Sequence, residues 1–138
     1  MTEPLDDELR VAILRLSRRM RAERAGEDVP DGQLSVLFVL WKEGAQTLSS
    51  LAEHERVTPP SMNRTVNSLV DAGLVTRDSS PDDGRKVLIQ PTEAGLEIAR
   101  ETKRRRVAWF ARQLDTLTPA QRATIDAATP ILRELADS

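Results

Sequence analysis

The stretch VTPPSMNRTVNSLVDAG, residues 57–73, decides the fold of this chain. Thr58 can cap the first turn of a helix, and Pro59 suits the first helical position, where no backbone N–H is needed. We therefore predict a helix that begins here and that Gly73 closes. Its predicted inward positions are Met62, Val66, Leu69 and Val70.

The opposite face of this helix is polar. It carries Ser61, Asn63, Arg64, Asn67 and Ser68. Arginine can bond guanine O6 and N7, and asparagine can bond adenine N6 and N7, in the major groove of DNA. The N-terminus of this helix, at residues 58–60, would also offer free backbone N–H groups to a phosphate. This pattern indicates a helix that reads DNA, with a merely solvated helix face as the alternative interpretation.

The neighbouring segments complete a recognisable unit. A short helix is expected over residues 47–54, with Ser49 or Ser50 as its N-cap. After the polar-faced helix, residues 74–77 and 86–90 are β-compatible runs separated by a turn-forming stretch. Helix, turn, second helix and hairpin are the parts of a winged helix-turn-helix.

Helical patterns flank this unit on both sides. An apolar stripe from Leu5 to Met20 predicts a first helix that ends between Glu27 and Gly32, and residues 33–42 predict a second, nearly all-apolar helix. A long helix opens at residues 91–95. A last helix opens at residues 118–119, with Pro130 as a kink site. The predicted fold class is mostly α with a small β-hairpin wing.

Composition excludes several classes of protein. The 138 residues contain 20 Lys+Arg and 22 Asp+Glu, and no apolar run approaches the length of a membrane helix. The acidic start, residues 1–8, lacks the pattern of an export signal, so we expect a cytoplasmic protein. Residues 58–106 form the only net positive third, with 9 basic and 7 acidic residues.

We expect no enzyme, cofactor or metal site. Cysteine is absent, and the single histidine, His54, has no partner at a zinc-ligand spacing. The serines lack a G-x-S-x-G setting, no glycine-rich phosphate loop exists, and Asp82 and Asp83 lie in an expected exposed turn.

The chain resembles the MarR family of bacterial transcriptional regulators over nearly its whole length. The resemblance is carried by residues 33–37, 51–53, 57–64, 69–77, 81–85 and 88–95. It implies one MarR-type domain over residues 1–138, with a winged helix-turn-helix lobe over 33–95 and dimerisation helices over 5–30 and 96–138. It further implies a homodimer on a pseudo-palindromic operator, with repression relieved by a small ligand.

In this family the wing carries an Asp-x-Arg element whose Arg enters the minor groove and whose Asp orients that Arg, and the resemblance places this element at Asp83, Gly84 and Arg85. Two departures are Gly84, where many members carry a basic residue, and Pro91, where leucine is usual. A surface ion pair between Asp83 and Arg85 is the alternative interpretation. The predicted DNA-binding residues are Thr58, Pro60, Ser61, Asn63, Arg64, Thr65, Asn67, Ser68, Arg77, Asp83 and Arg85.

Effector residues are harder to place from sequence. Arginines of the first helix and a tryptophan are candidates for a small aromatic or anionic effector: Arg15, Arg18, Arg19 and Trp41. Trp41 and Trp109 fill the core in the alternative interpretation. The basic run 103–106 lies inside a helix, so its side chains should point in different directions. A protein-interaction module without DNA binding is the alternative function, and activation in place of repression stays open.

Overall fold

The structure is a computed structural model that describes residues 4–138. Residues 1–3, the start of the acidic N-terminal stretch, lie outside the described part. The elements are α1 (Leu5–Arg21), α2 (Asp31–Glu43), α3 (Leu48–Glu55), α4 (Pro59–Asp71), β1 (Val75–Ser79), β2 (Val87–Pro91), α5 (Glu93–Leu114) and α6 (Pro119–Ala136). This order confirms the predicted winged helix-turn-helix fold class. None of the described helices has the length and apolarity needed to cross a membrane.

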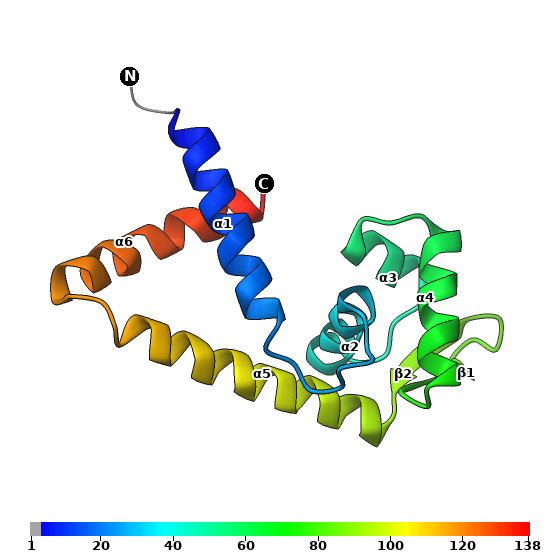
Figure 1. Ribbon diagram of the computed structural model, residues 1–138. Helices are drawn as coiled ribbons and strands as arrows, with labels where there is room; N and C mark the ends of the chain where they lie inside the picture. Colours follow the sequence, from blue (N-terminus) through cyan, green and yellow to red (C-terminus); the bar gives the residue numbers. More distant parts are fainter. Residues whose placement is uncertain (1–3) are drawn as a thin grey trace.

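The molecule consists of a lobe and an extended helical part (Figure 1). Helices α2, α3 and α4 and the wing pack together. Helix α5 leads away from this lobe, and α6 folds back from its far end. The core of the lobe contains fully buried side chains from every one of its elements: Leu34, Val36, Leu37, Leu40, Leu51, Met62, Val66, Leu69, Val75 and Ile89. Burial of this aliphatic surface holds the lobe together.

Helix α4 follows the prediction with one correction. Thr58 is its N-cap, and the Thr58 side chain accepts a hydrogen bond from the Ser61 N–H at 3.2 Å. Met62, Val66 and Leu69 are buried as predicted. Val70, predicted to face inward, is 38% exposed, because the buried stripe runs along the helix through Met62, Val66 and Leu69, and Val70 lies beside this stripe.

The N-cap of α3 is Thr47, so the prediction of Ser49 or Ser50 is wrong. The Thr47 side chain accepts from the Ser50 N–H at 3.1 Å, and the helix begins at Leu48. Both serines therefore lie inside the first turn, and the Ser50 hydroxyl donates to Gln46 Oε1 at 2.6 Å.

Helix α1 ends at Arg21, before the predicted limit of Glu27 to Gly32. The residues that follow are held on α5. The Ala25 N–H donates to Thr102 Oγ1 at 3.0 Å, and the Arg105 side chain donates to the Arg24 carbonyl oxygen at 2.8 Å. Hydrogen bonds to α5 thus take the place of the backbone hydrogen bonds that would extend α1 beyond Arg21.

The wing is a two-stranded antiparallel hairpin in which Val75 lies opposite Pro91 and Ser79 opposite Val87. Strand β1 extends two residues beyond the predicted end at Arg77. Gln46, in the segment before α3, pairs with Ile89 on the free edge of β2. The wing is therefore attached to the helical part of the lobe by backbone hydrogen bonds. At the other end of the chain, α6 continues through Pro130.

Helix α5 meets the lobe at Gly95, where the contact leaves no room for a side chain. A Cβ atom at this position would lie 2.2 Å from the Leu74 carbonyl oxygen and 3.1 Å from Leu37 Cδ2. Thr92 caps α5 by accepting from the Gly95 N–H at 3.2 Å, and its hydroxyl donates to the Gly73 carbonyl oxygen at 2.7 Å. These contacts join the end of α4, both strands and α5.

Gly95→Ala is expected to lower the free energy of unfolding by about 1 to 3 kcal/mol, because the added methyl forces the Leu74 backbone away from α5. Urea denaturation at fixed protein concentration measures the change. Gly32→Ala is the matched control, since its Cβ would meet nothing within 4 Å and alanine favours the helix. Equal stability of the two variants would contradict the close contact.

Candidate nucleic-acid interface

The polar face of α4 is presented to solvent by the buried face behind it. Arg64, Asn67 and Ser68 are exposed, as is Pro60 in the first turn. Because Met62, Val66 and Leu69 anchor the helix in the core, this outward face has a fixed direction. Its side chains have the donors and acceptors that reading of base edges requires.

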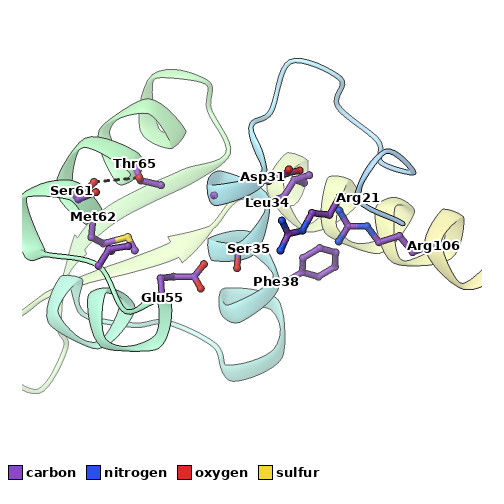
Figure 2. A pocket seen from close by; sticks show the side chains of 12 residues that line it. Arg21, Asp31, Leu34, Ser35, Phe38, Glu55, Ser61, Met62, Thr65 and Arg106 are labelled. Carbon is purple, nitrogen blue, oxygen red and sulfur yellow. Dashed lines mark hydrogen bonds between the residues drawn. The ribbon is translucent and has the colours of Figure 1, made fainter. Parts of the chain in front are cut away.

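Two of the predicted DNA-binding residues occupy a different position. Ser61 and Thr65 are partly buried and lie on the side of α4 that lines a cavity shared with α2 (Figure 2). The Thr65 hydroxyl donates to the Ser61 carbonyl oxygen at 3.3 Å. These two residues therefore lie at the border between the outward face and the cavity.

Strand β1 contributes Arg77 to the outward face of α4. The Arg77 guanidinium donates to Asn63 Oδ1 at 3.1 Å and to Asn67 Oδ1 at 2.6 Å, both through Nη2. The structure thus brings Asn63, Asn67 and Arg77 into contact, whereas the sequence only predicted that each of them binds DNA. Nothing in the local pattern indicated this contact, because it joins a helix to a strand.

The tip of the wing is shaped by Asp83. Its carboxylate accepts from the backbone N–H of Arg85 at 3.0 Å, and its carbonyl oxygen accepts from the Lys86 N–H at 3.0 Å. In the part of the chain that the structure describes, the Asp83 and Arg85 side chains form no ion pair. Asp83 therefore orients the backbone of the tip, and the Arg85 side chain is exposed.

A cavity of about 480 Å³ lies behind α4, between the lobe and α5. Figure 2 shows Arg21 and Arg106 on one side of it, and Met62 and Thr65 on the other. Phe38 lies beside Arg21 on the arginine side, with the Arg106 guanidinium 5.5 Å from its ring centre. The cavity thus combines two cations with an aromatic surface.

The charged residues that line this cavity are two arginines, Arg21 and Arg106, and two carboxylates, Asp31 and Glu55. Burial lowers the pKa of the Arg106 guanidinium from its ordinary value; the carboxylate of Asp31 opposes this, while the charges of Arg21 and Arg24 add to it. Asp31 is itself paired with Arg24 at 2.9 Å.

The residues predicted for effector binding lie elsewhere. Arg15, Arg18 and Arg19 line a shallow hollow on α1, and the Arg19 guanidinium lies 5.6 Å from the Trp109 ring centre. Trp41 lines another hollow, where Lys103 Nζ lies 5.4 Å from its ring centre. The structure does not bring Trp41 together with these arginines.

The sequence did not single out the residues that line the cavity behind α4. Arg21 and Arg106 lay within basic stretches whose other members looked equivalent. The run 103–106 does point in different directions: Lys103 lies over Trp41, Arg104 pairs with Glu101, and Arg105 and Arg106 donate to carbonyl oxygens of the α1–α2 linker. Only the folded arrangement distinguishes Arg106 from its neighbours.

Comparisons with known proteins agree with this architecture. Residues 29–87 match the model of the MarR family. An uncharacterized HTH-type transcriptional regulator of Mycobacterium bovis, Mb0904, is 41% identical over 133 residues, which are 96% of this chain and 93% of the relative. The HTH-type transcriptional repressor Mb2911 of the same organism is 33% identical, with coverage of 84% and 86%.

A solved structure extends the similarity to the whole fold. The crystal structure of Rv1404 from Mycobacterium tuberculosis has a TM-score of 0.83 and 27% sequence identity, and covers 99% of this chain and 97% of its own. The outward face of α4, the wing and the matched sequences point to a DNA-binding regulator and not to an enzyme. By its sequence and its fold, this chain belongs to the MarR family of HTH-type transcriptional regulators.

Proposed function

We propose that the chain is a dimeric cytoplasmic repressor that binds a pseudo-palindromic operator near its own gene and is released by a small anionic effector. The observation that carries this proposal is the joint presentation of the α4 polar face and the exposed wing arginine, Arg85, on one lobe. The relation to a named repressor of Mycobacterium bovis supports repression over activation.

The dimer is supported by apolar surface that one chain leaves uncovered. Helices α1 and α6 bury none of their described residues. Their exposed apolar side chains are Leu5, Val11, Ile13, Leu14, Leu16, Ile125, Ile131, Leu132 and Leu135. Exposed apolar side chains in this number favour a partner surface of the same kind. A two-fold pair would place its two α4 helices on successive major grooves, about 34 Å apart.

The operator is tested by fluorescence anisotropy with labelled duplexes tiled across the DNA upstream of the gene, at two salt concentrations and with excess unrelated DNA. We expect tight binding to one tile, weaker at higher salt, with two chains per duplex. Sedimentation velocity gives the oligomeric state without DNA. Absence of salt-dependent duplex binding would instead favour a winged-helix module that binds protein. Equally weak binding to every tile would contradict the proposal that the operator lies near the protein's own gene.

Substitutions of Arg64 and Arg85 are expected to weaken binding in different ways. Arg64→Ala should reduce operator affinity by about 1 to 3 kcal/mol with little effect on unrelated DNA, because the lost bond is to a base edge. Arg85→Ala should lower affinity and make the salt dependence shallower, because the lost charge lies against the minor groove. Anisotropy titrations at several salt concentrations separate the two.

Lys42→Ala is the charge-matched control for these variants. Lys42 lies in the hollow beside Trp41 and Lys103, so its removal changes net charge by the same amount away from the reading face. If Arg64→Ala changes operator affinity no more than Lys42→Ala does, Arg64 is not one of the residues that read bases. A salt slope unchanged by Arg85→Ala would count against the wing contact.

Effector release is proposed from the cavity behind α4. The cavity shares Ser61, Met62 and Thr65 with the reading helix, so a ligand that fills it would press on α4 from behind. Arg21 and Arg106 suit a carboxylate, and Phe38 suits an aromatic ring. We therefore favour a small aromatic acid as the effector class.

Benzoate is the probe for this proposal. It is expected to raise the melting temperature and to weaken operator binding by about 5- to 150-fold at saturation. Benzamide, which has the ring without the charge, should have a much smaller effect, and Arg21→Gln should remove the response while sparing operator binding. Equal responses to benzoate and benzamide, or an unaltered response in Arg21→Gln, would overturn the anionic class.

A further inference from the structure

Arg77 lies where it can control how α4 meets DNA. It follows Val75 by two residues on β1, so both side chains are on the same face of the strand. Val75 is buried in the core, and Arg77 lies at the solvent edge of that face, against α4. No carboxylate lies within ion-pair distance of its guanidinium among residues 4–138. Its side-chain partners are the amides of Asn63 and Asn67.

The chemistry of these partners decides which way the two amides point. A guanidinium has only donors, so the end of each asparagine that meets it must be the oxygen. The distances of 3.1 Å and 2.6 Å from Arg77 Nη2 to the two Oδ1 atoms are hydrogen-bond distances. Each planar amide therefore directs its Nδ2, a donor, away from Arg77.

We propose that Arg77 is a positioning residue that sets the base preference of α4 by holding Asn63 and Asn67 through their amide oxygens, which makes both asparagines donors toward DNA. With Arg64 beside them, the outward face of α4 then presents donors at three neighbouring positions. Donors select the acceptor edges of the major groove: guanine N7 and O6, adenine N7 and thymine O4. This inference rests on the proposed reading of an operator by α4.

The arrangement changes what the asparagines were expected to read. A free asparagine can pair with adenine through both ends of its amide, accepting from N6 and donating to N7. Here one end of each amide is already engaged by Arg77. The base positions opposite Asn63 and Asn67 should therefore prefer an acceptor-rich edge, and guanine offers two acceptors side by side.

The test is a discrimination profile with purified full-length protein. Operator duplexes with one base pair changed at each half-site position are titrated by anisotropy against wild type and Arg77→Ala. In the wild type, single changes at read positions should cost about 5- to 150-fold in affinity. The base pairs that each side chain reads are found from the variants Asn63→Ala, Asn67→Ala and Arg64→Ala. In Arg77→Ala, the loss of affinity on changing a base pair read by Asn63 or Asn67 should fall to a few-fold. The loss on changing a base pair read by Arg64 should stay as large as in the wild type.

Two further measurements separate positioning from other roles. If Arg77 instead contacts a phosphate, Arg77→Ala weakens all duplexes equally and lowers the salt slope by about one, with the profile unchanged; this result would overturn the proposal. If Arg77 acts by positioning Asn67, the double variant Arg77→Ala/Asn67→Ala should discriminate between base pairs at the Asn67 position as Asn67→Ala alone does. An additional loss at that position would also overturn it.

The design keeps this inference distinct from the proposed function. A wild type without operator specificity would refute the proposed function itself, whereas a specific wild type with an unaltered Arg77→Ala profile refutes only the role of Arg77. Circular dichroism checks folding of each variant. If Arg77→Ala does not fold, Arg77→Met gives the same test, because methionine keeps the apolar part of the side chain and has no donor for either amide, and we expect the same flattened profile.

Discussion

The carbonyl oxygen of Leu74 meets the first turn of α5 at a point where no side chain fits, and the geometry of the DNA-facing lobe depends on this contact. Helix α4 ends just before it, and Gly73, with φ at +73°, turns the chain into β1. Strand β2 ends at Pro91, and the next residue, Thr92, donates its N–H to the Leu74 carbonyl oxygen and its hydroxyl to the Gly73 carbonyl oxygen. Helix α4, the wing and α5 therefore start or end within one hydrogen-bonded junction.

The two faces of α4 have different partners, and this connects the interface with the cavity. The outward face carries Arg64, Asn67 and Ser68, and the border residues Ser61 and Thr65 reach the cavity. Met62 belongs both to the core and to the cavity wall. Met62 therefore joins the wall of the cavity to the core that anchors α4.

Local sequence signals were sufficient to predict most helices and strands, but not the contacts between them. Thr58 and Pro59 marked the start of α4 because capping depends on a few adjacent residues. The end of α1 was misplaced because Thr102 and Arg105, about eighty residues away, decide it. In the candidate site, Arg64 and Arg85 followed from residue type and position. The joining of Arg77 to two asparagines, and the place of Arg106 beside Phe38, depend on packing between elements and have no local signature.

The linker between α1 and α2 is bound to α5 mainly through its backbone. Arg106 donates to the carbonyl oxygen of Glu23, Arg105 to that of Arg24, and Thr102 accepts from the N–H of Ala25. Such bonds do not depend on the linker side chains, so residues such as Glu23 and Ala25 are free to drift in evolution without moving the chain. The orientation of α1 relative to the lobe thus depends on three residues of α5 that lie about eighty positions away in the sequence, and not only on the segment that makes the covalent connection.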